Sequence, residues 1–232
     1  MSEALKKVSG IKHLPLFPLP LVLLPNELLP LHIFEERYRK MLKDVETDRR
    51  LFGVTHFEPG ESLVEKPSTG TVGCVAEIRE TQELPDGRSN IITVGVVRYH
   101  LLDYVDAGEP YFIGDVEFFE DEPEDQPSLH ELSEGVHALF ERVAKAAFKL
   151  SDNRGKFPEI PKTDPEQLSF LITAAFNLDN ELKYRLLETN STSDRLNKLK
   201  EILEQTVNKM EESAEIHKIS QSNGHTKKKL DI

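Results

Sequence analysis

The chain has 232 residues, of which 38% are hydrophobic and 30% are charged, and its formal net charge at pH 7 is −12. A chain of this length can bury one large core or two small ones, so we expect two packed parts. The acidic balance disfavours binding to phosphate backbones, because such binding requires clustered basic side chains. A single cysteine, Cys74, excludes an intramolecular disulfide and fits a reducing cytoplasm.

Residues 14–41 form an apolar segment that five prolines interrupt, at positions 15, 18, 20, 25 and 30. Proline fixes φ and lacks a backbone N–H, so the segment cannot form one continuous helix or a central strand. The pattern predicts short extended pieces joined by turns, and neither a signal peptide nor a membrane span. After Pro30, a helical spacing predicts a short amphipathic helix with Phe34, Tyr38, Met41, Leu42 and Val45 on its apolar face.

The next part of the chain has the pattern of a small β-barrel. Branched and aromatic residues, partly in alternation, predict strands at 51–57, 71–84, 90–97 and 111–119. The turn sequence Pro85-Asp86-Gly87-Arg88 predicts a β-hairpin between the second and third of them. Several short strands with glycines inside them suggest a partly closed barrel.

An acidic stretch, residues 115–126, separates this part from a region of helical periodicity. Ser128 with Glu131 predicts a capping box at the start of a long helix. Asp164-Pro165 predicts a second helix start, leucines at 178–187 a third helix, and Ser191 the cap of a fourth. Short connections predict an antiparallel bundle. Residues 1–10 and 211–232 are polar, and we expect both to be disordered.

Several strings resemble the Lon protease N-terminal (substrate-recognition) domain, especially its stand-alone bacterial versions. They are LPLFPL and LPLHIFEERYR near the start, GTVGCVAEI, the DGR turn with VGVVRYHLLD, PYFIGDVE, and the helical block from Asp164-Pro165 to Arg195-Leu196. The resemblance covers nearly the whole chain. It implies an α+β fold in which a PUA-like β-barrel or pseudo-barrel (residues 11–122) is followed by a C-terminal helical bundle (residues 123–210).

No residues suggest catalysis. The sequence has no G-x-x-x-x-G-K-[ST] loop for a nucleotide, and it ends too soon after the bundle for us to expect the ATPase and serine–lysine peptidase modules of full-length Lon. The histidines are scattered, and His130 and His137 are seven residues apart, too far to share an ion without a third element. We therefore expect no catalytic, cofactor-binding or metal-binding residues, and no enzyme activity.

The resemblance implies non-catalytic binding of exposed apolar segments of unfolded or partly unfolded polypeptides, linked to protein quality control or proteolysis. Candidate contacts are Leu21, Leu23, Leu24, Phe34, Tyr38 and Arg98. Arg98 follows an apolar strand, where it either anchors a carboxylate or carbonyl of a ligand or forms a structural ion pair. The alternative function is RNA binding through the PUA-like barrel, which the charge opposes. A separate protease or chaperone as partner, and an oligomeric state, are left open.

Overall fold

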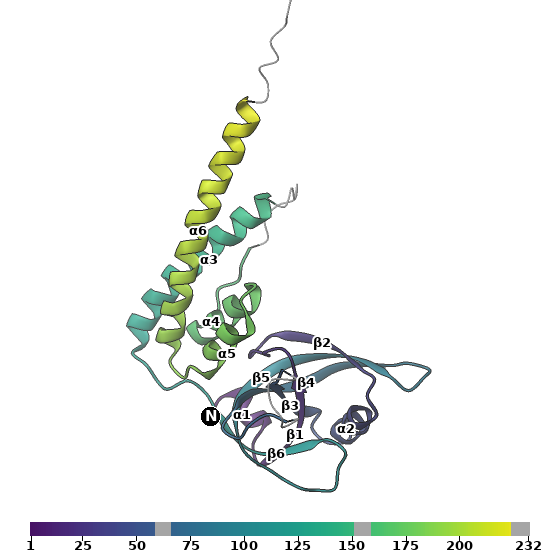
Figure 1. Cartoon of the computed structure of the whole chain (residues 1–232). Helices are drawn as coiled ribbons and strands as arrows, with labels where there is room; N and C mark the ends of the chain where they lie inside the picture. Colours follow the sequence, from purple (N-terminus) through teal and green to yellow (C-terminus); the bar gives the residue numbers. More distant parts are fainter. Residues whose placement is uncertain (59–65, 151–158, 224–232) are drawn as a thin grey trace, which may run out of the picture. The chain divides into compact units, whose positions relative to one another are not determined.

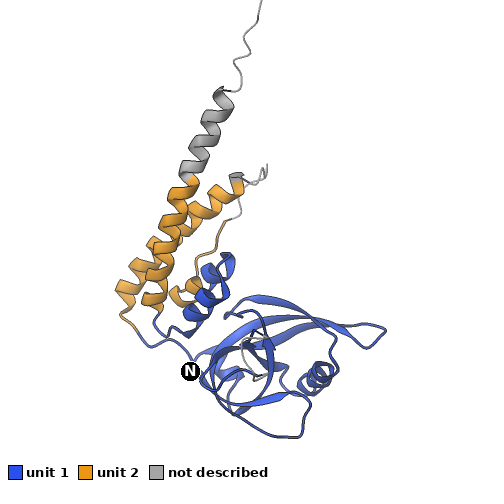
Figure 2. Ribbon diagram, in the orientation of Figure 1, with its two compact units in different colours: residues 1–123, 170–191 blue, residues 124–169, 192–232 orange. Residues whose placement is uncertain are grey.

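The computed structural model describes residues 1–58, 66–150 and 159–223. They fall into two compact units (Figure 2). Unit 1 comprises Met1–Pro123 and Phe170–Ser191, and unit 2 comprises Glu124–Ser169 and Thr192–Ile232. The mixture of sheet and helices confirms the predicted α+β class.

Unit 1 is built on a six-stranded sheet with the order β2-β5-β4-β3-β1-β6 (Figure 1). The strands are β1 His13–Leu19, β2 Leu28–Ile33, β3 Leu51–His56, β4 Val72–Glu83, β5 Ser89–Tyr104 and β6 Phe112–Phe119. An additional pairing of β5 with β6 closes five of the strands into a ring, which leaves β2 outside it. Closure gives every strand in the ring a hydrogen-bonded neighbour on each side.

The proline-rich opening segment forms two separate strands, as predicted. Strand β1 is part of the ring, whereas β2 pairs only with β5. Between them the chain turns at Asn26, which has a φ of 63°. Leu23 and Leu24 are buried beside this turn. The segment therefore supplies core residues although it is not one continuous strand or helix.

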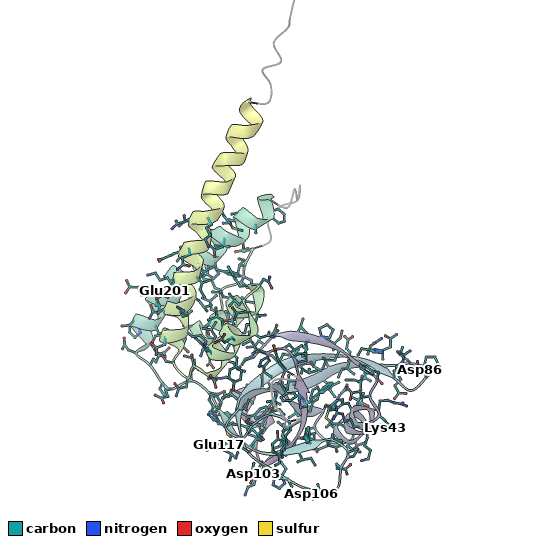
Figure 3. The ribbon with its side chains drawn as sticks, in the orientation of Figure 1. Lys43, Asp86, Asp103, Asp106, Glu117 and Glu201 are labelled. Atoms are coloured by element: carbon teal, nitrogen blue, oxygen red, sulfur yellow. The ribbon has the colours of Figure 1, made fainter. Side chains whose placement is uncertain are left out.

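The predicted hairpin is also present. The turn from Leu84 to Arg88 joins β4 and β5, Gly87 has a φ of 80°, and the amide of Leu84 donates to the carbonyl of Arg88 at 2.8 Å. Asp86 lies at the outer tip of this hairpin (Figure 3). A hydrogen bond from the Arg88 side chain lowers the pKa of Asp86 to about 2. A positive φ at the turn requires glycine or an equivalent residue, which explains the match with the sequence prediction.

The start of the chain differs from the prediction, because residues 1–10 are not a disordered lead-in. Helix α1 spans Glu3–Lys7, and the hydroxyl of its N-cap, Ser2, accepts a hydrogen bond from the amide of Leu5 at 3.0 Å. Val8 follows the helix and is buried in a core cluster with Leu14 and Leu16 of β1. One capped turn and one buried side chain hold this segment in place, and neither stands out in a sequence whose other residues are mostly polar.

Helix α2, Glu36–Glu46, follows β2 and presents Tyr38, Met41, Leu42 and Val45 to the core. These four were predicted on its apolar face. Phe34, the fifth residue of that predicted face, precedes the helix and is 59% exposed. The reason is that the helix begins at Glu36 with Glu35 as its N-cap, so Phe34 is outside the helical repeat.

Helix α5, Asn180–Glu188, and the last residues of α4, Pro165–Ala175, group with the strands of unit 1. Phe170 and Leu187 are buried in one cluster with Val22, Leu24 and Val72. The sequence predicts one separate helical part over residues 123–210. Residues 170–191 differ from this prediction because their apolar side chains pack against residues of the barrel. Helical periodicity shows that one face of a helix is buried, but it does not show which element covers that face.

Unit 2 contains the long helices α3, Gln126–Leu150, and α6, Thr192–Asn223, which pack against each other. Helix α3 starts before the predicted capping box: the carboxylate of Asp125 accepts from the amide of Ser128 at 3.1 Å. The α4 start was correctly predicted, since the carboxylate of Asp164 accepts from the amide of Gln167 at 3.0 Å. The predicted disordered tail begins inside α6, which continues to Asn223; residues 224–232 are outside the described residues.

Candidate functional site

The structure separates the six candidate contact residues by burial. Leu23, Leu24, Tyr38 and Arg98 are each at most 4% exposed, and Leu21 is half-buried. Only Phe34 among the six is well exposed. Because a buried side chain offers no surface to a docked peptide in this conformation, the peptide-binding proposal now depends on Phe34, with a smaller share for Leu21.

Phe34 is part of a larger exposed surface, which we call the outer-edge patch. Its members are Leu28, Pro30, Phe34 and Ile92. Leu28 is 66% exposed and Ile92 is 38% exposed. Strand register brings them together, since Pro30 lies opposite Ile92 and Leu28 lies opposite the half-buried Val94. Large apolar side chains that gather on a surface mark an interaction site more reliably than scattered ones do.

A polar pair holds the end of this patch in place. The ring of His32 stacks on Phe34 with 6.0 Å between their centroids, and its Nδ1 lies 2.7 Å from Oδ1 of Asn90 on β5. The stacking orients an otherwise exposed phenylalanine. The outer-edge patch therefore has a defined shape. It lies on the side of unit 1 where β2 extends the sheet beyond the ring of strands.

Arg98 serves the fold and not a surface. Its guanidinium forms an ion pair with Asp121 and donates to the carbonyls of Leu187 and Thr189 at 3.0 and 2.6 Å. It also lies over the ring of Phe119. Of the two interpretations that the sequence left open, the structure shows the ion pair. Arg98 joins β5 to the end of α5 within unit 1.

The interior of the barrel offers no reactive group in its described residues. Burial raises the pKa of the Cys74 thiol to about 12, so the sulfur is protonated at neutral pH. Burial also raises the pKa of Tyr99, whose hydroxyl lies 2.6 Å from that of Thr55. Both groups are therefore neutral core residues.

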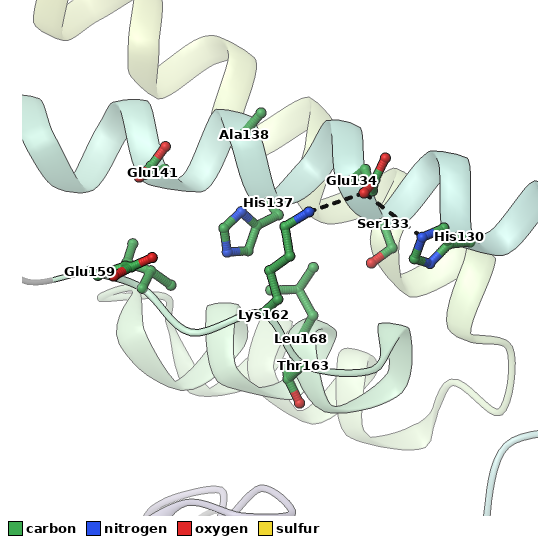
Figure 4. A pocket seen from close by; sticks show the side chains of 11 residues that line it. His130, Ser133, Glu134, His137, Ala138, Glu141, Glu159, Lys162, Thr163 and Leu168 are labelled. Atoms are coloured by element: carbon green, nitrogen blue, oxygen red, sulfur yellow. Dashed lines mark hydrogen bonds and ion pairs between the residues drawn. The ribbon is translucent and has the colours of Figure 1, made fainter.

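Unit 2 contains a cavity of about 440 Å³ between α3 and the segment that leads into α4 (Figure 4). Its titratable lining residues are His130, Glu134, His137, Glu141, Glu159 and Lys162. Nζ of Lys162 is 3.1 Å from Oε1 of Glu134, and this contact lowers the pKa of Glu134. No hydrogen bond among the described residues joins the Ser133 or Thr163 hydroxyl to a histidine, so the lining has no nucleophile with an adjacent base.

The family model of the ATP-dependent protease La (LON) substrate-binding domain matches residues 13–205. The chain belongs to this family. Lon protease 2 of Herpetosiphon aurantiacus is 26% identical over 213 residues, which are 90% of this chain and 26% of that protein. Lon protease 1 of Syntrophobacter fumaroxidans is 27% identical, over 80% of this chain and 23% of that protein. The chain thus spans about a quarter of the length of these relatives.

Two solved structures of Lon N-terminal domains share the fold of this chain. The Lon N-terminal domain protein from Xanthomonas campestris superposes with a TM-score of 0.58 at 22% identity, over 82% of this chain and 97% of that one. The N-terminal domain of Mycobacterium avium complex Lon protease gives 0.62 at 18% identity, over 83% and 98%. These structural likenesses confirm the predicted fold, and the family model confirms the predicted family.

In this member of the LON substrate-binding family, no three His, Cys, Asp or Glu side chains of the described residues are placed to hold one metal ion. None of the helices in the described ranges is both long and apolar enough to cross a membrane. Leu28, Pro30 and Ile92 are not among the contact residues predicted from the sequence. The alternation of Leu28, Pro30 and His32 in a strand that contains proline was the signal for an exposed face at a sheet edge.

Proposed function

We propose that this chain binds exposed apolar segments of unfolded polypeptides through the outer-edge patch and contributes to proteolysis by recognition and not by catalysis. The observation that carries the proposal is the exposure of Leu28, Phe34 and Ile92 together on one side of unit 1. The description of the matched family as a substrate-binding domain supports it. The full-length relatives are named as proteases, so a separate protease or chaperone is the partner that we propose.

Burying these side chains against an apolar segment supplies the binding free energy. Each buried large apolar side chain contributes about 1.5–3 kcal/mol before the cost of ordering the bound chain. Two or three such residues therefore predict weak, sequence-tolerant binding, which suits recognition of many unfolded chains. The buried free thiol of Cys74 is consistent with a reducing compartment, and we propose the cytoplasm.

RNA binding, the alternative, gains no support from the surface of unit 1. Several of its exposed cations pair with acidic side chains: Arg37 with Glu35, Arg88 with Asp86, and both Lys7 and Arg79 with Glu77. Phosphate binding needs basic groups that are free to replace counterions. Measurement of RNA binding at low salt tests this alternative directly.

The test of the proposed function uses reduced, carboxymethylated α-lactalbumin, a permanently unfolded chain, with affinity measured by fluorescence anisotropy. A double variant, Leu28→Ser with Phe34→Ser, should weaken binding by about tenfold or more while leaving the thermal midpoint unchanged, because both side chains are exposed. The matched control is Leu102→Ser, which removes an exposed leucine of β5 outside the patch and should bind as the wild type does. Equal binding by the double variant and the wild type would contradict the proposal.

A further inference from the structure

Strand β2 differs from the other strands in its pairing. Each strand of the ring has neighbours on both sides, whereas β2 has one neighbour, β5. Figure 1 shows β2 along the border of the sheet. A strand at a border presents unpaired N–H and C=O groups on its free side, and a further strand can pair with them.

The backbone groups that face this free side can be assigned. The amide of Gly95 donates to the carbonyl of Glu27 at 2.9 Å, and the register of β2 with β5 continues from this pair. Along an antiparallel ladder, the backbone N–H and C=O groups of successive residues point alternately toward the paired strand and away from it. The backbone groups of residues 29, 31 and 33 therefore point toward β5, and those of Leu28, Pro30 and His32 point away from it. Pro30 agrees with this assignment, since a proline facing β5 would remove a ladder hydrogen bond.

No hydrogen bond within the described residues involves the backbone of Leu28 or His32 on that side. The free edge therefore offers two amide donors and three carbonyl acceptors, with one donor missing at Pro30. Because Pro30 has no N–H, two copies of the chain pair less well through this edge, but the remaining donors and acceptors can still pair with another strand.

The side chains beside this edge define the chemistry of the occupant. Pro30 of β2, Ile92 of β5 and Glu80 of β4 form one row across the outer face of the sheet, by their register. The outer face is apolar on β2 and β5, where Pro30 and Ile92 lie, and acidic on β4, where Glu80 lies. Glu80 is exposed and has no ion pair among the described residues. The complementary segment is apolar where it meets the edge, and the net charge of −12 on the chain favours a segment with basic residues on either side of that apolar part.

We propose that the free edge of β2 takes an extended apolar segment of another polypeptide, flanked by lysine or arginine, as an added β-strand. The inference rests on the proposed function and specifies its mode. Backbone pairing supplies affinity that does not depend on the bound sequence, and alternate side chains of the segment contact Leu28, Pro30 and Phe34. The bound segment is extended, not helical.

The test uses a peptide of about ten residues that alternates valine or phenylalanine with threonine and has two lysines at each end. The alternation fixes which face meets the patch. Two further versions carry backbone N-methyl groups at alternate core positions, on the valine and phenylalanine residues in one and on the threonines in the other. In an added strand the amides of only one set face β2, so one version should lose about tenfold or more in affinity and the other should bind normally.

Replacement of Pro30 tests the same inference from the side of the protein. Pro30→Val keeps an apolar side chain and adds an outward donor, so it should bind the unmodified peptide about three- to tenfold tighter. The matched control Leu102→Val, which changes an exposed β5 residue outside the patch, should bind as the wild type does. Lysine-to-glutamate replacement in the peptide flanks should weaken binding in a salt-dependent manner.

The outcomes separate the two proposals. If neither the unmodified peptide nor the unfolded protein binds, the proposed function fails. If the unmodified peptide binds and both methylated versions bind equally, or both are equally weakened, strand addition is refuted and the proposed function stands. An unchanged affinity of Pro30→Val would also refute strand addition.

Discussion

The guanidinium of Arg98 lies over the ring of Phe119, with 4.4 Å between its Cζ and the ring centroid. Both residues belong to paired strands of unit 1, and Arg98 lies directly opposite Phe119 in the register of β5 with β6. The ring covers one face of a cation that is 1% exposed and also paired with the carboxylate of Asp121. A buried cation held this way fixes the end of α5 through the Leu187 and Thr189 carbonyls.

Replacement of Arg98 by methionine should therefore destabilise the protein strongly. Asp121, whose side chain is 5% exposed, would lose its guanidinium partner, and two carbonyls would lose donors. Removal of one member of a buried ion pair costs about 3–5 kcal/mol. Urea unfolding at pH 7 measures this change in the free energy of unfolding.

The control for this prediction is the double variant Arg98→Met with Asp121→Leu. Removal of both charges leaves no uncompensated ion, so part of the lost stability should return. Polypeptide binding per folded molecule should be unchanged in both variants, because Arg98 has almost no surface. A single variant within about 1 kcal/mol of the wild type would refute the structural role.

Two glycines should respond in opposite ways to alanine. A Cβ at Gly95 would lie 2.0 Å from the carbonyl oxygen of Leu24, which is backbone and cannot rotate away. Gly95→Ala should therefore destabilise the protein by about 2–3 kcal/mol. A Cβ at Gly135, inside α3, would meet nothing within 4 Å, so Gly135→Ala should stabilise by about 0.5–1 kcal/mol. Thermal unfolding followed by circular dichroism distinguishes them, and similar effects at both sites would contradict the packing around Gly95.

Local chemistry made much of the fold predictable from sequence. The interrupting prolines excluded a helix in residues 14–31, and the Asp86-Gly87 turn determined a hairpin, because both effects act within a few residues. The grouping of α5 with the barrel could not be predicted. The leucines of α5 show that one face is buried, but the partner of that face lies more than a hundred residues earlier, around Val72.

The candidate site was predictable only in part, for a similar reason. An apolar run such as Leu21 to Leu24 does not show which side chains face the core, and most of them do. Exposure of Leu28, Pro30 and Ile92 follows from strand register and from the position of β2 outside the ring, both of which are non-local. Phe34 is among the contact residues predicted from the sequence, but it precedes the helix to which the sequence pattern assigns it.

The start of α3 provides another test. The Asp125 carboxylate accepts from both the amide and the hydroxyl of Ser128, and these bonds lower its pKa. Asp125→Ala should lower the thermal midpoint by about 2–4 °C, because the first turn loses its cap. Asp125→Asn keeps an acceptor and should lose less. Ser128→Ala should have the smaller effect of the two alanine variants, and the reverse order would support the capping box predicted from Ser128 and Glu131.

The ionised side chain of Glu27 should destabilise the folded protein, and this effect should depend on pH. Burial raises its pKa, partly offset by a hydrogen bond of 2.9 Å from the amide of Leu24 to Oε2 and by the charge of Lys183. Because the folded state then binds the proton more tightly than the unfolded state, stability from this group is present at low pH and is lost as the pH rises through the folded pKa. Glutamine keeps the acceptor and removes the charge. Glu27→Gln should therefore raise the thermal midpoint at pH 7 by on the order of 1–2 °C.

The same linkage predicts that the advantage of Glu27→Gln disappears near pH 4, where the wild-type carboxyl is protonated in the folded state and largely in the unfolded state. Thermal unfolding at both pH values measures it. Glu80→Gln is the matched control, since Glu80 is exposed on the same sheet and should leave the midpoint unchanged at either pH. A lower midpoint for Glu27→Gln at pH 7 would mean that attraction to Lys183 outweighs the cost of burial, and the predicted sign of the pKa shift would then be wrong.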